Sequence, residues 1–158
     1  MLGTHHQSAI VSDVGFKIGE HGATSEGEMV ICRRIRVTTA QVNAAGGTAL
    51  LPALSGKKYR MVDATMIAIG GNASGATTVD IVSKQSTSTV KLLAGAVGGL
   101  TENTILKPFT ATHAAVLTAG ASFAACDAGE AVLITKTGSN LATSTHIDVI
   151  LSYCIEAA

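Results

Sequence analysis

The last part of the chain carries an alternation that suits a β-strand and no other regular element. From residue 146 to 156, apolar side chains occupy every second position: Ile147, Val149, Leu151, Tyr153 and Ile155. Successive side chains of a strand point to opposite faces, so this pattern buries one face. The other face, with Asp148, Ser152 and Glu156, is left for polar surroundings. The segment therefore predicts a core strand.

Shorter alternating segments recur along the chain at the spacing of a sheet protein. Strands are predicted at 29–38, 59–69, 77–83, 104–109, 114–118 and 130–136, with a strand followed by a loop at 89–100. Turn-forming clusters at 70–75, 127–129 and 138–140 separate them, and 42–52 is expected to be a loop or a short edge element. In 59–69 both faces are apolar and are expected to be largely buried. Together these segments predict an all-β fold, an antiparallel β-sandwich of jelly-roll or Greek-key type.

The chain before residue 29 differs from the rest. Residues 1–28 are polar and contain Gly15, Gly19, Gly22 and Gly27, without sustained periodicity. Such a segment cannot bury enough apolar surface to offset its ordering entropy, so we expect it to be disordered alone or held by a partner. The chain, at 158 residues, suits one domain. We therefore predict an extended N-terminal arm, 1–28, followed by one β-sandwich domain, 29–158.

The charge composition restricts the partners. The chain has 11 basic and 11 acidic residues, so no net field draws it toward nucleic acid or an anionic membrane. No apolar run reaches the roughly 18 residues of a membrane span. Charged residues make up 14% of the chain, against about 25% in ordinary soluble domains. A surface so poor in charge favours association, and we expect a homotrimer.

The ends and the cysteines indicate a reducing compartment. Residues 1–12 lack the basic and apolar stretches of a secretory signal, so we expect the chain to fold in a cytoplasm. Cys32, Cys126 and Cys154 are odd in number, far apart and without metal-binding spacing. We therefore expect no disulfide, and each cysteine is predicted to be a small buried apolar residue.

The sequence contains no recognisable set of catalytic or cofactor-binding residues. The histidines are His5, His6, His21, His113 and His146, and only the last two could meet as metal ligands on neighbouring strands. Asp80 and Asp148 lie on the polar faces of predicted strands, where solvated or interface carboxylates are expected. The glycine runs lack the ending of a phosphate loop, and no serine or cysteine has a nucleophile motif. We predict no enzymatic activity, no cofactor and no metal.

The one concentration of charge is basic, and it supplies the candidate interface residues. These are Arg33, Arg34, Arg36, Lys57, Lys58 and Arg60. Strand alternation places Arg34 and Arg36 on one face and Arg33 on the other. That arrangement favours salt bridges over contact with a phosphate backbone. The expected partners are a neighbouring chain or the acidic residues of the arm, Glu20, Glu26 and Glu28.

Four stretches resemble small virion-associated proteins of tailed bacteriophages, among them capsid cement or decoration proteins. They are VTTAQVN at 37–43, LLPALSGKKYR at 50–60, MIAIGG at 66–71 and HIDVIL at 146–151. The resemblance is one of overall residue pattern and extends over residues 35–156. It implies a β-sandwich trimer at the three-fold axes of an icosahedral shell, clamping subunits of the major capsid protein. The protein would be made in the host cytoplasm and act on the outer surface of the virion.

Two other classes stay open at this point. A receptor-binding tip of a phage tail fibre would share the trimeric β-rich build, but the exposed aromatic and acidic residues of glycan sites are sparse here. A small-ligand-binding jelly roll would need clustered ligands, which the sequence lacks. Proximity of the gene to head or tail genes would separate the first two classes.

Overall fold

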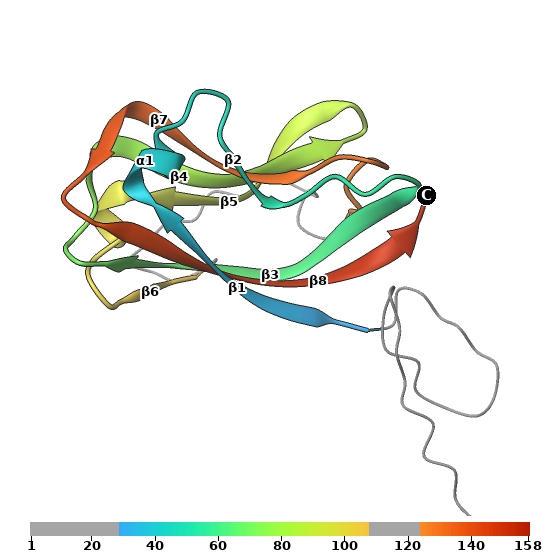
Figure 1. Ribbon diagram of the computed structural model, residues 1–158, viewed down its shortest axis with the longest axis horizontal. Helices are drawn as coiled ribbons and strands as arrows, with labels where there is room; N and C mark the ends of the chain where they lie inside the picture. Colours follow the sequence, from blue (N-terminus) through green and yellow to red (C-terminus); the bar gives the residue numbers. More distant parts are fainter. Residues whose placement is uncertain (1–28, 108–123) are drawn as a thin grey trace, which may run out of the picture.

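The computed structural model describes residues 29–107 and 124–158, which form two facing β-sheets (Figure 1). The elements are β1 (Ile31–Thr38), α1 (Thr39–Val42), β2 (Thr48–Leu51), β3 (Lys57–Ile69), β4 (Ser74–Gln85), β5 (Ser88–Ala96), the 3₁₀-helix η1 (Val97–Gly99), β6 (Ile105–Leu106), β7 (Val132–Ala142) and β8 (His146–Ala157). The predicted arm, 1–28, and the predicted strand 114–118 lie outside the described residues. The predicted all-β sandwich is confirmed.

Each sheet has four strands, and every pairing is antiparallel. Sheet A has the order β1-β8-β3-β6 and sheet B the order β2-β7-β4-β5. The first four strands pair with the last four in reverse order: β1 with β8, β2 with β7, β3 with β6, and β4 with β5. A long hairpin acquires this pairing when it is folded over and rolled into two sheets, as in a jelly roll.

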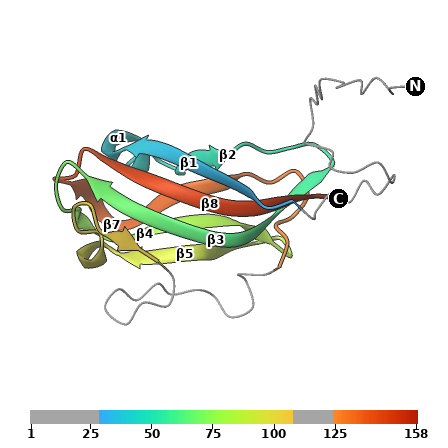
Figure 2. The same ribbon diagram turned by 90° about the horizontal axis from the view of Figure 1, so that it is seen from below.

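The core lies between the two sheets and is aliphatic. Its largest fully buried side chains are Leu51, Met66, Ile81, Leu93, Leu100, Leu106, Ile134, Ile147 and Leu151. The predicted core strand is β8, where Ile147, Val149 and Leu151 are all 0% exposed. β8 lies between β1 and β3, so its inner face has neighbours on both sides (Figure 2). This central position explains why its alternation is the clearest in the chain.

A β-bulge in β3 changes which of its side chains face the core, compared with the strict alternation expected from its sequence. The register with β8 shifts between Met61 and Asp63, which leaves Val62 as the extra residue, 47% exposed. The strand therefore turns Met61 and, beyond the bulge, Met66 toward the same core. Strict alternation would put Ile67 on the same face as Met61, but Ile67 lies on the outer face and is only partly buried. The expectation that both faces of 59–69 are largely buried is thus too broad.

One further boundary differs from the sequence prediction, and one prediction of an edge element is confirmed. The turn expected at 138–140 lies inside β7, where Gly138 has a φ of +74° and the register with β4 shifts near Ala76. This glycine marks an irregularity within a strand and not its end. The segment 42–52, expected to be a loop or an edge element, contains the edge strand β2. Just before it, α1 is opened by a capping box between Thr38 and Gln41.

The cysteines are all free, and two of the three are buried as predicted. Cys126 and Cys154 are 1% and 7% exposed. Cys32 is exposed, which contradicts the expectation that it is a buried apolar residue. Cys32 on β1 lies opposite Ser152 on β8, and β1 is at the edge of its sheet, where no other strand of the described residues lies on its far side to cover the thiol.

Candidate interaction surface

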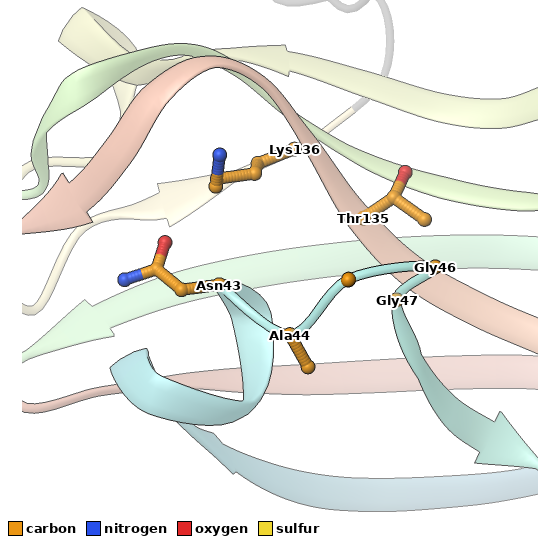
Figure 3. Close-up of a pocket in the computed structure, with 7 residues that line it drawn as sticks. Asn43, Ala44, Gly46, Gly47, Thr135 and Lys136 are labelled. Carbon is orange, nitrogen blue, oxygen red and sulfur yellow. The ribbon is translucent and has the colours of Figure 1, made fainter.

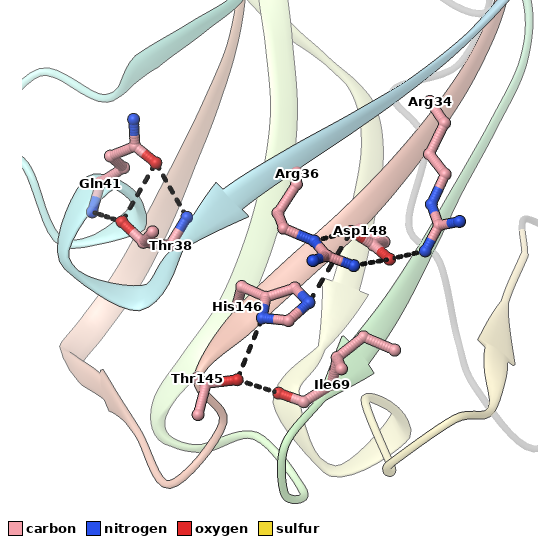
Figure 4. Close-up of polar contacts among 8 residues, drawn as sticks. All are labelled: Arg34, Arg36, Thr38, Gln41, Ile69, Thr145, His146 and Asp148. Atoms are coloured by element: carbon pink, nitrogen blue, oxygen red, sulfur yellow. Dashed lines mark hydrogen bonds and ion pairs between the residues drawn. The ribbon is translucent and has the colours of Figure 1, made fainter.

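The outer face of sheet A holds an ion-pair cluster built by two strands (Figure 4). Arg36 on β1 lies directly opposite Asp148 on β8, and Arg34 is two residues away on the same face. Arg36 Nε donates to Asp148 Oδ1 at 3.1 Å and its Nη2 to Oδ2 at 3.4 Å, while Arg34 Nη2 donates to Oδ2. One carboxylate therefore holds two guanidinium groups.

The burial of this carboxylate corrects the sequence prediction. Asp148 was expected to be a solvated or interface carboxylate, but its side chain is 0% exposed, against 62% for Arg34 and 60% for Arg36. The long arginine side chains reach across the shorter aspartate and keep their outer surfaces in solvent. The two arginine side chains therefore cover Asp148 on the outer face of the sheet, and their own guanidinium groups remain accessible to solvent.

Asp80 on the outer face of sheet B is buried in the same way, again against expectation. Its side chain is 2% exposed, with Lys91 Nζ from β5 at 2.8 Å. Thr78 Oγ1 donates to the same carboxylate at 3.0 Å. Both corrections have one cause: a lysine or arginine on the neighbouring strand covers the acid.

The electrostatic balance at Asp148 favours its charged form. Burial by itself raises the pKa of a carboxyl group, but the hydrogen bonds and charges of Arg36 and Arg34 outweigh it, so the pKa of Asp148 lies below its usual value. The hydrogen bond to Asp148, helped by its charge, raises the pKa of Arg36. Both shifts favour the charged forms of Asp148 and Arg36 near neutral pH.

We expect Asp148→Asn to remove an acid-dependent part of the stability. Because the folded-state pKa is lowered, ionised Asp148 stabilises the fold above its unfolded pKa, and this contribution fades as pH falls through the folded pKa. Urea unfolding of both proteins between about pH 6 and 3 should show a stability difference that shrinks toward acid. A difference that stays constant over this range would contradict the assignment.

Three of the remaining predicted basic residues, Lys57, Lys58 and Arg60, lie together on β3 beside the C-terminal end of β8. Arg60 on β3 forms a two-pronged pair with Glu156 on β8, with Nη2 to Oε2 at 3.1 Å. The hydrogen bond from Arg60, together with its charge and that of Lys58, lowers the pKa of Glu156. Lys57 lies opposite Ala157 at the end of the same pairing. Asp148 and Glu156 thus anchor two separate clusters on one strand.

These positions test the sequence prediction in part. Arg34 and Arg36 share a face, as predicted, while Arg33 is exposed but makes no contact with Asp148. The pairs form inside the chain, with acids of β8 that sequence reasoning did not name as partners. The polar alternation of β8 was the one signal that could have indicated them. The acids named instead, Glu20, Glu26 and Glu28, lie outside the described residues.

Of the two histidines considered as metal ligands, His113 and His146, the described residues include only His146. His146 Nδ1 lies 3.0 Å from Thr145 Oγ1, and its Nε2 is 3.9 Å from Asp148 Oδ1. His113 lies outside the described residues. Within residues 29–107 and 124–158, no three His, Cys, Asp or Glu side chains gather closely enough to hold a metal ion. In the same part of the chain, no helix is long and apolar enough to cross a membrane.

A shallow hollow lies between the turn after α1 and β7 (Figure 3). Its volume is about 470 Å³, and its lining is Asn43, Ala44, Ala45, Gly46, Gly47, Thr135 and Lys136. Asn43 fixes the turn, donating to Leu141 O at 2.9 Å and accepting from Leu141 N at 2.7 Å. Small side chains and one lysine amine offer neither an apolar lining nor converging polar groups for a ligand.

Comparison with known proteins finds no family model, no curated protein and no solved structure that matches this chain. The functional proposal therefore rests on the fold, on the surfaces of the two sheets and on the sequence resemblance.

Proposed function

We propose that this protein is a structural virion protein, a capsid decoration protein of a tailed bacteriophage. In this role it forms a homotrimer on the outer surface of the head and bridges neighbouring subunits of the major capsid protein. The observation that carries the proposal is the sandwich itself, with its concentrated charges paired across strands within the chain. Such a body is a compact block suited to association, and the sequence resemblance points to the phage head.

The arginine pair offers a means of contact with a capsid. Arg34 and Arg36 each carry five N–H donors, and Asp148 engages only some of them. The outward N–H groups of these half-exposed side chains can donate to a carboxylate of another chain in a two-pronged geometry. The buried carboxylate holds both guanidinium groups in place, which reduces the entropy lost on binding.

A decoration protein stabilises the shell by mass action. A protein that binds the assembled lattice but not free subunits lowers the free energy of the assembled state, by an amount that grows with its concentration. No catalytic step is needed. We therefore expect the effect to be seen in the resistance of heads to heat, and not in their rate of assembly.

The test is binding to heads of the phage that encodes the chain, prepared without this protein. We expect saturable co-sedimentation of purified protein with the heads and a higher melting temperature of decorated heads in scanning calorimetry. Binding should reach a stoichiometry that is a multiple of three per lattice site. Absence from heads together with presence on tails, seen by antibody labelling in electron micrographs, would favour the tail-fibre alternative and overturn the proposal.

A further inference from the structure

His146, at the start of β8, lies beside the ion-pair cluster with its ring nearly buried (Figure 4). Its side chain is 14% exposed, and its Nδ1 lies 3.0 Å from Thr145 Oγ1. Nε2 is fully buried, has no hydrogen-bond partner and lies 3.9 Å from Asp148 Oδ1. Buried polar atoms are almost always hydrogen-bonded, so this nitrogen needs an explanation.

The hydrogen bonds of Thr145 fix which ring nitrogen carries the proton. Thr145 Oγ1 donates its single proton to Ile69 O at 2.9 Å, so toward His146 it can only accept. The neutral ring is therefore protonated on Nδ1, and Nε2 presents a bare lone pair on the side of the Asp148 carboxylate. Two electron-rich atoms then face each other without a proton to share. A proton on Nε2 replaces this contact with a charge-assisted hydrogen bond.

The charges around the ring come from two strands. The aspartate lies two residues further along β8, and the two arginines that hold it extend from β1. On the other side, β3 places Ile69 opposite His146, and Glu102 lies along the edge of β3 that faces away from β8. Helix α1 and the turns at 70–73 and 143–145 carry no titratable side chain. Protonation of the ring is thus set by one close carboxylate, which favours it, against two arginines and burial, which oppose it.

We propose that His146 makes this surface sensitive to pH. Protonated Nε2 donates to Asp148 Oδ1 after a shift of about 1 Å, since such bonds are about 2.7–2.9 Å long. Oδ1 also accepts from Arg36 Nε at 3.1 Å, and Arg36 is held less firmly once the carboxylate serves three cations. The charge of the cluster, two arginines against one aspartate, rises from one positive charge to two. An outside carboxylate is therefore bound more tightly by Arg34 and Arg36 in mild acid.

The pH range of the effect separates this surface from its partner. Histidines change charge between about pH 5 and 8, whereas aspartates and glutamates of a partner stay ionised down to about pH 4. Mild acid therefore adds charge to His146 and removes none from the acid that binds the arginines. The coupling of His146 to Arg36 is a property of this chain alone. Its consequence for capsid binding rests on the proposed function.

The first experiment follows both groups by NMR in the full-length wild-type protein labelled with ¹⁵N. We expect the ring of His146 to be protonated on Nδ1 at about pH 8 and to gain its second proton on Nε2 before about pH 5. The Arg36 Nε–H signal should shift with the same midpoint as the His146 ring. No substitution is involved, so the result does not depend on the folding of a variant.

Three results of this titration would overturn the inference. They are a neutral ring protonated on Nε2, a ring that stays neutral down to about pH 5, and an Arg36 Nε–H signal that does not follow the titration of His146.

The second experiment measures the ratio of the dissociation constants for heads at about pH 8 and about pH 5.5, by co-sedimentation. We expect tighter binding at the lower pH in the wild type, by about three- to tenfold, because one unit charge is added close to the bound carboxylate. His146→Asn keeps an N–H donor for Thr145 but cannot gain the charge, so its ratio should fall to about one. His113→Asn, which removes a histidine at another position, is the control and should keep the wild-type ratio.

The outcomes separate the inference from the proposed function. Heads bound equally well at both pH values, a wild-type ratio retained in His146→Asn, or a ratio lost in His113→Asn would overturn the pH dependence and leave the proposed function standing. Heads that bind at neither pH, while Arg36 follows His146 in the NMR titration, would overturn the proposed function and leave the coupling in place.

Discussion

Truncation of Met66 to alanine is expected to lower the free energy of unfolding by about 2–5 kcal/mol. Met66 is 0% exposed and lies on the inner face of β3, beyond the bulge. Across the sandwich it meets Gly95 of β5, where an added Cβ would lie 2.8 Å from Met66 Cε. Gly95 has no side chain that could move into the space left by the methionine, so a cavity is expected there unless Leu106, which also lies against Gly95, shifts into part of it.

The neighbouring residue supplies the control. Ile67→Ala removes a side chain of similar size from the outer face of the same strand, where it is only partly buried. We expect a loss of about 1 kcal/mol, since roughly half of the transfer free energy of a fully buried isoleucine is at stake. Urea unfolding followed by circular dichroism gives both values. Equal losses, or a larger loss at Ile67, would show that the bulge at Val62 is absent.

This pair of residues also shows where sequence reasoning stops. Alternation identified 59–69 as a strand, because a period of two is a property of the chain itself. The phase of that alternation depends on the partner strand, and a single extra residue at Val62 exchanges inner and outer faces for everything after it. Both Met66 and Ile67 are apolar, so composition could not decide between them. The bulge could be located only from the pairing with β8.

The candidate surface could likewise be predicted from the sequence only in part. Residues two apart on a strand share a face, so Arg34 and Arg36 could be grouped from the sequence. Their partner could not be named, because Asp148 lies far along the chain and meets β1 only through the antiparallel pairing of the first and last strands. The burial of Asp148 is likewise a product of the folded sheet. The exposure of Cys32 follows from the edge position of β1, which alternation does not reveal.

Deletion of residues 1–28 is expected to abolish the decoration of heads while leaving the oligomer intact. The shortened chain would begin at Met29 and keep all strands, including the complete pairing of β1 with β8 from Ile31 to Thr38. An extended segment that docks on a lattice gains main-chain hydrogen bonds and buried area. Co-sedimentation with heads measures occupancy, and light scattering measures the oligomer.

The size of the effect follows from the number of arms. A trimer presents several arms to the same lattice, and each further contact becomes intramolecular once the first has formed, which multiplies affinity by about 10²–10⁴. Loss of all of them should weaken binding to heads by at least about 10²-fold, while circular dichroism of the sandwich stays unchanged. If the shortened protein bound heads with full occupancy, the sandwich itself, with Arg34 and Arg36 the first residues to test, would be the adhesive surface.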